Sequence, residues 1–376
     1  MSFLKKLLPA LVVAAVVPVS GAAFESDMAK YKVAFYGHVK TDAMYDNHNL
    51  STLAGGDYLT YTDTTGPNSK DFRVSARATR MGLDLGSPDG LDAKIEMDFL
   101  GALSGTSATP RIRHAYITMR FERFKRLQIL AGQTWHLTPL ELPDTNNEFA
   151  FGYSGCLWFR APQVRLTYDL SDSLKVAAAA VRPNIDQSDS QGTHSGLPLT
   201  EAQAEYKLGA MVFTLAGAYG AVKNTATQAH GDVWLGDLGF RVPVGIVTVN
   251  GQLWTGTNLA DFFGGIGQLG YGTGEIHANG GFLDVKVKPK DWLWFNAAYG
   301  VDDPRDDQVA NLGRTQNQRA MGNVSVLLGG VVTSTTEVSY NLTRFKDSNG
   351  VNGRDYKSGW HYQWSLKFPF RIVRGG

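Results

Sequence analysis

The chain has 376 residues, of which 43% are hydrophobic, 36 are Lys or Arg and 35 are Asp or Glu. This balance of charge excludes a polybasic nucleic-acid-binding surface, and the single cysteine, Cys156, excludes an internal disulfide framework and a multi-cysteine metal site. The mean hydropathy of -0.18 is typical of a soluble protein, but a transmembrane barrel has similar values because its inward positions are polar. Hydropathy alone therefore does not separate these two classes.

The first 23 residues have the organisation of a secretory signal peptide. Lys5 and Lys6 form a positive region, residues 7–17 form an apolar core, and small residues at 20–23 permit cleavage after Ala22 or Ala23. The apolar core is shorter than the ~20 residues that a spanning helix needs. We therefore predict a cleavable signal peptide over residues 1–23 and a single barrel domain over residues 24–376.

Apolar and polar residues alternate along most of the remaining chain, which is typical of strands with one apolar and one polar face. The last segment shows the pattern most strictly, with Tyr362, Trp364, Leu366, Phe368 and Phe370 separated by Gln363, Ser365 and Lys367 among others. The pattern predicts sixteen strands, over residues 33–46, 72–86, 91–100, 111–121, 127–135, 163–170, 174–182, 200–207, 210–220, 232–242, 246–256, 278–288, 291–301, 318–328, 331–345 and 360–370.

The third predicted strand, residues 91–100, illustrates the two faces. Its apolar residues are Leu91, Ala93, Ile95, Met97 and Phe99, and its charged residues are Asp92, Lys94, Glu96 and Asp98. Four charges on one side of a strand need water, so we expect a wet interior and a lipid-facing exterior. In the second strand the apolar residues change parity, which predicts a β-bulge near Thr79 and Arg80.

The connections alternate between short turns and long loops. The long loops are predicted near residues 47–71, 101–110, 136–162, 183–199, 221–231, 257–277, 302–317 and 346–359. Short turns on one rim and long loops on the other are typical of outer-membrane barrels, and sixteen strands leave an aqueous passage. The predicted fold is therefore an all-β, sixteen-stranded, antiparallel transmembrane barrel.

Several segments resemble the DcaP-like family of outer-membrane porins. They are residues 35–46, 77–85, 113–116, 130–135, 143–145 and 160–165. The resemblance implies a trimeric channel for small, often anionic, organic solutes. Two features depart from the family pattern: the first strand starts too early for the periplasmic coiled coil that some members carry, and residues 371–376 follow the last aromatic residue.

The segment 136–162 is the longest predicted loop and is the candidate for narrowing the pore, with Phe149, Phe151, Trp158 and Phe159 as apolar anchors. It could instead lie over the mouth or pack at a subunit contact. We predict that selectivity depends on charged residues at this narrowing and on the adjacent wall. The candidates for pore lining are Lys40, Arg77, Arg80, Arg111, Arg113, His136, Asp144, Glu148, Arg160 and Arg165.

The arginines offer paired donors to carboxylates or phosphates, although each of them could instead pair with a carboxylate of the wall. The predicted function is passive diffusion of small hydrophilic solutes, with a weak preference for anions, across the bacterial outer membrane. Expected partners are these solutes, membrane lipid, lipopolysaccharide and two further copies of the chain, with no nucleic acid.

The sequence leaves two alternatives to a porin, an adhesin-like or structural barrel and an enzyme. An adhesin-like or structural barrel would have a closed lumen and would not conduct. An enzyme would need a compact catalytic motif such as G-x-S-x-G or H-E-x-x-H, and the sequence contains neither. No cofactor is implied. The acidic residues at 302, 303, 306 and 307 could bind a hard cation, but we favour a solvated acidic loop and predict no metal site.

Overall fold

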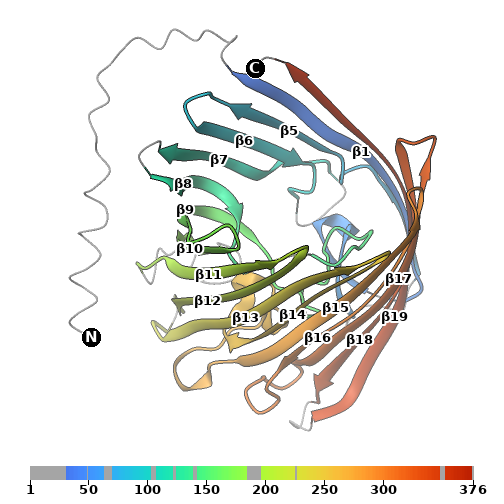
Figure 1. Ribbon diagram of the computed structural model, residues 1–376. Coiled ribbons are helices and arrows are strands. Elements are labelled where there is room, and N and C mark those ends of the chain that lie inside the picture. The colour runs from blue at the N-terminus through green and yellow to red at the C-terminus, as the bar shows by residue number, and fades with distance from the viewer. Residues whose placement is uncertain are drawn as a thin grey trace, which may run out of the picture.

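The computed structural model describes residues 31–48, 50–62, 70–102, 107–121, 124–138, 142–183, 196–224, 227–347 and 352–374. Over these residues an antiparallel sheet curves round and closes on itself as a barrel (Figure 1). None of the helices in these ranges has the length and hydropathy needed to cross a bilayer. The predicted signal peptide, residues 1–23, lies outside the described residues.

The barrel wall consists of β1 (Lys32–Asp46), β4 (Asp71–Ser75), β5 (Arg80–Gly86), β6 (Leu91–Asp98), β7 (Arg111–Phe121), β8 (Phe124–Trp135), β9 (Arg160–Asp169), β10 (Leu174–Val181), β11 (Leu199–Leu208), β12 (Met211–Lys223), β13 (His230–Val244), β14 (Val247–Thr257), β15 (His277–Lys290), β16 (Leu293–Pro304), β17 (Arg314–Leu328), β18 (Val332–Lys346) and β19 (Asn352–Arg374). Both β4 and β5 pair with β1, so they form one strand that is interrupted at residues 76–79. The predicted sixteen-stranded barrel is therefore confirmed, and the predicted irregularity lies at this interruption.

The barrel closes between its first and last strands. β1 pairs with β19 from Val33 opposite Arg374 to Asp46 opposite His361. The last strand is therefore longer than the predicted 360–370, and residues 371–374 belong to it, with Ile372 opposite Phe35. Apolar residues after Phe370 continue the lipid-facing row, which is why the strand does not end there.

The two faces of the wall follow the predicted alternation. In β6, Leu91 and Ile95 are each 48% exposed on the outside, whereas Glu96 and Asp98 are 7% and 1% exposed inside. Exposed apolar side chains in water would be costly, but they suit contact with lipid. The alternation thus places the charged residues in the lumen.

Short turns lie together at one rim of the barrel. Residues 209–210, 245–246 and 329–331 each connect two adjacent strands, and Gly209 and Gly245 adopt φ angles of 59° and 57° that tight hairpins favour. β1 begins opposite Gly86, immediately before the turn into β6, so both ends of the wall lie at this short-turn rim. The long connections therefore lie at the opposite rim.

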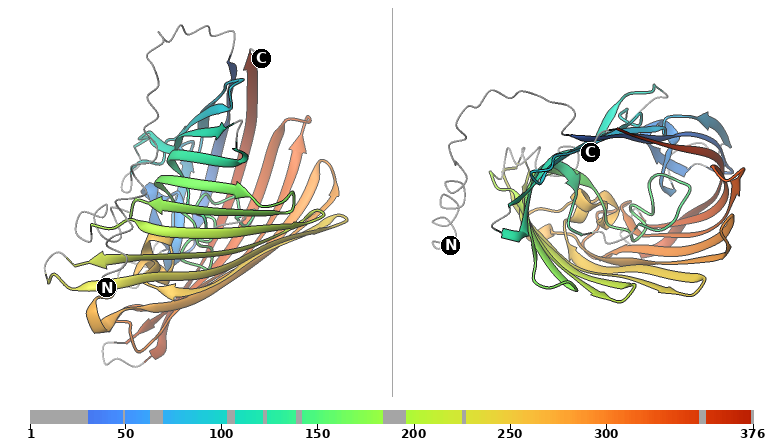
Figure 2. Two further views of the ribbon diagram at one scale, coloured as in Figure 1. Left: turned by 60° about the vertical axis from the view of Figure 1, so that its left-hand side comes forward. Right: turned by 45° about the horizontal axis from the view of Figure 1, so that its top comes forward.

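Three of the long connections fold inside the barrel instead of extending from it (Figure 2). They are a hairpin of β2 (Leu50–Leu53), η4 (Ala54–Gly56) and β3 (Tyr58–Thr62); the inner loop, which is described over residues 136–138 and 142–159; and residues 258–276 with η6 (Leu259–Phe262), η7 (Gly265–Gly267) and η8 (Gly272–Gly274). The predicted outer loops 47–71 and 257–277 therefore both contribute to the interior. Their apolar residues are buried against the inner loop, which explains the direction in which they fold.

Candidate functional site

The inner loop is fixed to the wall at its first residues. His136 Nδ1 hydrogen-bonds the Glu201 carboxylate of β11, and the Leu137 amide donates to Glu201 Oε2 at 2.8 Å. The His136 ring also lies 4.9 Å from the Phe262 ring and is only 3% exposed. The structure therefore places His136, a predicted pore-lining residue, at the base of the loop and away from the two cavities described below.

A wall carboxylate also holds the tip of the loop. Glu337 of β18 accepts hydrogen bonds from the backbone amides of Asn146 and Asn147. From the adjoining strands β1 and β19, Lys40 Nζ donates to the Asn146 carbonyl at 2.7 Å, and Ser365 Oγ donates to Asn146 Oδ1 at 2.7 Å. Bonds to a charged acceptor stabilise more than neutral ones, so Glu337 is a strong anchor.

Between base and tip, the loop backbone lies directly on β15 and β16. Gly155 has φ of 105°, and a side chain there would overlap the Gly281 carbonyl. A side chain at Gly300 would likewise overlap the Ser154 carbonyl. Trp254 Nε1 donates to the Gly155 carbonyl at 2.8 Å. Only glycine allows this close approach of loop to wall.

An aromatic core fills the space between the inner loop and the other two inward segments. The rings of Phe149 and Trp158 lie 5.5 Å apart, and each is about 5 Å from Phe263, at 4.9 and 4.8 Å respectively. Tyr58 of the hairpin lies 5.1 Å from Phe149. Cys156 is fully buried beside them, and burial raises the pKa of its thiol well above the usual value. The predicted apolar anchors thus hold the loop inside the barrel.

Several predicted arginines pair with carboxylates of the wall. Arg111 Nη2 is 2.6 Å from Asp98 Oδ2, and Arg113 contacts Glu96 at 2.7 Å and Asp98 at 3.0 Å. Arg77 Nη2 lies 2.9 Å from Asp57 of the hairpin. These pairs reduce the positive field that each guanidinium presents to a solute.

Arg165 and Asp144 also have partners. Arg165 donates to Gln163 Oε1 at 2.9 Å and to the Trp135 carbonyl, so it supports the wall and lines neither cavity. Asp144 forms an ion pair with Lys286 of β15. Asp144 lines the second of the cavities described below.

Glu148 lies between two cations. Its carboxylate is 3.0 Å from Lys40 Nζ and 3.4 Å from Arg80 Nη2. Burial would raise the pKa of Glu148, but Lys40, Arg80 and Arg113 together hold that pKa well below its usual value. Glu148 is therefore ionised over the whole physiological range and offsets part of the surrounding positive charge.

Arg160 and Lys367 differ from Arg80 and Arg113, the other two cations that line the first cavity, because no carboxylate of the described residues pairs with them. The Arg160 guanidinium lies over the Trp135 ring, 4.2 Å from its centroid, and 5.6 Å from that of Trp158. Lys367 follows Ser365 on the inward face of β19. Both residues line a cavity of about 250 Å³.

This first cavity is positively charged. Its charged lining comprises Arg80, Arg113, Arg160 and Lys367 against one carboxylate, Glu148. Trp135 and Trp158 supply aromatic surface on one side. Guanidinium groups in a cavity with low-dielectric walls attract anions strongly, because the walls focus their field and screen it less than bulk water does.

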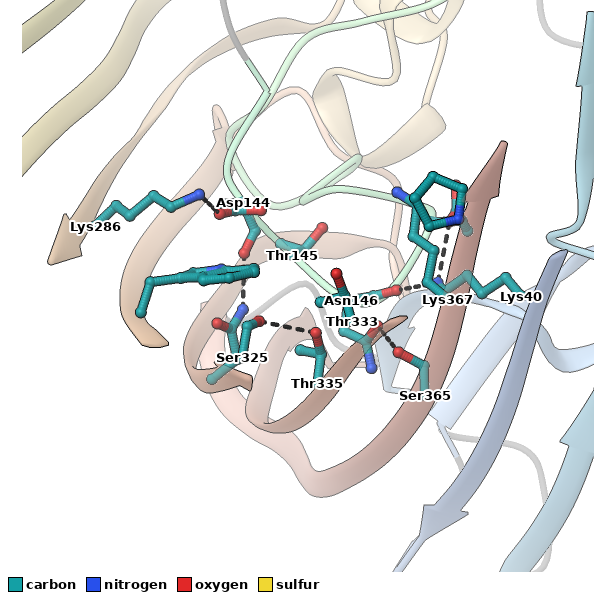
Figure 3. Close-up of a pocket in the computed structure, with 14 residues that line it drawn as sticks. Lys40, Asp144, Thr145, Asn146, Lys286, Ser325, Thr333, Thr335, Ser365 and Lys367 are labelled. Carbon is teal, nitrogen blue, oxygen red and sulfur yellow. Dashed lines mark hydrogen bonds and ion pairs between the residues drawn. The ribbon is translucent and has the colours of Figure 1, made fainter. Parts of the chain in front are cut away.

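A second cavity, of about 330 Å³, adjoins the first and shares Thr145, Glu148 and Lys367 with it (Figure 3). Its remaining lining comes mainly from β15–β19 and includes Lys286, Trp294, Ser325, Thr333, Thr335 and Ser365. Thr333 is the second residue of β18, directly after the 329–331 turn, so this cavity faces the short-turn rim.

Sequence reasoning missed Lys367, Trp135 and the hairpin residues Asp57 and Tyr58. The alternation of the last strand placed Lys367 inside, so its position was available, but nothing linked it to the inner loop. The contacts of Asp57 and Tyr58 depend on how residues 50–62 fold back, which no local pattern reveals. Within the described ranges, no three His, Cys, Asp or Glu side chains gather closely enough to hold a metal ion.

The closed barrel, its lipid-facing exterior and its charged cavities define an outer-membrane porin. A family model described as DcaP outer membrane protein matches residues 20–239, and the chain belongs to this family. The predicted family, the bacterial outer-membrane location and the channel function are therefore confirmed. A comparison with curated proteins gave no match.

Solved structures with a similar fold are also outer-membrane channels. The outer membrane channel DcaP of Acinetobacter baumannii has a TM-score of 0.77 and 19% identity, over 93% of this chain and 100% of that chain. The anion-selective porin from Comamonas acidovorans has a TM-score of 0.60 and 13% identity, over 90% and 100%. Salmonella typhi OmpF has a TM-score of 0.61 and 12% identity, over 91% and 99%.

Proposed function

We propose that this porin passes small hydrophilic solutes with a preference for anions. The observation that carries the proposal is the first cavity, where no described carboxylate pairs with Arg160 or Lys367 and Glu148 is the one acid among the described lining residues. Of the other predicted arginines, Arg111 and Arg113 pair with wall carboxylates and Arg77 pairs with Asp57 of the hairpin, so they contribute less field.

The preference follows from local arrangement, because the chain as a whole is almost neutral. Charges inside a low-dielectric wall act over short distances with little screening, whereas charges on the rims are screened within about 8 Å at physiological salt. Arg160 and Lys367, which no described carboxylate pairs with, therefore favour anions in the pore more than their share of the total charge suggests.

The test is the zero-current potential of the purified, refolded protein in a planar bilayer under a KCl gradient. We expect the wild type to reverse toward the chloride equilibrium potential, and Arg160→Gln and Lys367→Gln each to reverse closer to zero. Lys290→Gln, which removes one exposed cation at the end of β15, serves as the matched control. A cation-leaning wild type, or variants indistinguishable from Lys290→Gln, would contradict the proposal.

We further propose that the protein assembles as a homotrimer with lipopolysaccharide around its outer loops. OmpT of Vibrio cholerae, which has a similar fold, has been solved in a trimer form. Chemical cross-linking in outer-membrane vesicles should trap a species of three chains. The proposed cleavage after residue 23 would be checked by the intact mass of the exported protein.

A further inference from the structure

The second cavity has a different chemistry from the first. Its floor between β17, β18 and β19 consists of hydroxyl groups, from Ser325, Thr333, Thr335 and Ser365 (Figure 3). Trp294 of β16 lies beside this floor, in register with Ser325 of β17, and also lines the cavity. A cavity that only had to repel cations would not need hydroxyls, so this lining indicates recognition of hydrogen-bonding groups.

Several of these groups keep unused hydrogen-bonding capacity. Ser325 Oγ and Thr335 Oγ1 bond each other at 2.8 Å, and since each hydroxyl can donate one bond and accept two, the pair retains a donor and acceptor sites. The Thr333 hydroxyl has no partner among the described residues, and Asn323 Oδ1 is buried without one. A bound solute or water must satisfy these atoms.

Charge is placed at the edges of this hydroxyl floor. At the boundary with the first cavity lies Lys367, which no described carboxylate pairs with. At the other edge, Lys286 is already paired with Asp144 and lies 5.3 Å from the Trp294 ring centroid. Among the described residues, the cavity therefore offers one cation without a carboxylate partner, several hydroxyls and one aromatic ring.

We propose that the second cavity is a binding site for sugar acids, meaning monosaccharides that carry one carboxylate. The carboxylate would pair with Lys367, the sugar hydroxyls would bond Thr333 and Thr335, and the C–H face of the sugar ring would pack on Trp294. A volume of about 330 Å³ lies at the small end of the range for ligand sites and suits one monosaccharide. This site rests on the proposed anion preference because Lys367 serves both cavities.

The experiment compares two monoanions that differ only in their hydroxyl groups and their ring oxygen, D-glucuronate and cyclohexanecarboxylate. Each is added to single channels of the full-length protein, and its dissociation constant is read from block or noise of the ion current. We expect glucuronate to bind at least about tenfold more tightly than cyclohexanecarboxylate, since several hydrogen bonds each contribute a few-fold.

The doubly substituted Thr333→Val and Thr335→Val channel should lose most of this preference, to about twofold. Thr336→Val makes the same change on the exposed outer face of β18 and should keep the preference intact. Trp294→Ala tests the ring face separately and should weaken the binding of both acids, because each presents a C–H ring face to the indole.

Equal binding of the two acids by the wild type would overturn the sugar-acid site, and so would a folded Thr333→Val and Thr335→Val channel that still discriminates. Either result leaves the anion preference untouched, because both probes carry the same charge. If the channel has no anion preference, the zero-current potential under the KCl gradient will show this independently of the two acids. If the double variant does not fold, Ser325→Ala replaces it and must reduce the preference for glucuronate.

Discussion

Neutralising Glu148 should make the channel more selective for anions. Glu148 is the single carboxylate among the charged residues that line the first cavity, and it also lines the second. In a Glu148→Gln channel, Lys40 at 3.0 Å and Arg80 at 3.4 Å would each lose this carboxylate. Each cation would keep one longer ion pair, with Asp42 at 3.3 Å and with Glu96 at 3.6 Å respectively, so part of its charge would be released toward the lumen. The glutamine retains a carbonyl oxygen that can accept from Lys40, so the loop should remain folded inward.

The size of the effect follows from Coulomb's law. A unit charge about 7 Å from a permeating ion contributes ~0.6 kcal/mol at the dielectric constant of water, and ~0.25 kcal/mol once 0.15 M salt screens it. Removing a negative charge favours anions and disfavours cations by the same amount. The ratio of anion to cation permeability should therefore rise between about twofold and sevenfold.

The assay is the zero-current potential under a KCl gradient, measured beside Asp291→Asn as a control. Asp291 is a fully exposed carboxylate at a short turn, 3.4 Å from Lys288, and its loss should leave the potential unchanged. The temperature at which the barrel unfolds in detergent shows whether each variant is folded. A folded Glu148→Gln channel whose potential is unchanged, or moves toward cations, would refute the electrostatic account of the constriction.

The remaining predictions concern pH and the docking of the inner loop. The pKa of Glu148 is held below its usual value, so the stability that its ionised form adds is present above the ordinary glutamate pKa. That stability is lost as the pH falls through the lower pKa of the folded protein. The zero-current potential should therefore stay constant from pH 7 to pH 5 and shift toward anions only in stronger acid. Gly155→Ala should displace the loop and raise conductance, whereas Gly274→Ala, at a site with open space around it, should not. Glu337→Ala strands two buried amides and should cost about 2 kcal/mol of stability and increase current noise. Cys156 should resist a water-soluble thiol reagent in the wild type and react in Gly155→Ala; a reactive wild-type thiol would contradict the buried loop.

Much of the barrel is determined locally and can therefore be predicted from sequence. A strand presents alternate residues to opposite faces, so the period of two in segments such as 91–98 reveals both the strand and its inward charges. The alternation of residues 362–370 likewise predicts that Lys367 faces the lumen. The end of the final strand was predicted too early, because the pairing of residues 371–374 with β1 depends on barrel closure.

The interior, by contrast, was decided by tertiary structure. The pairing of Arg77 with Asp57 and of His136 with Glu201 joins residues from separate segments, and no spacing in the chain predicts which carboxylate each will meet. Whether a cation faces solute or a wall acid depends on which loops fold inward. That choice is made by apolar residues such as Tyr58, Phe149 and Phe263, which become buried only when three distant segments pack together inside the closed barrel.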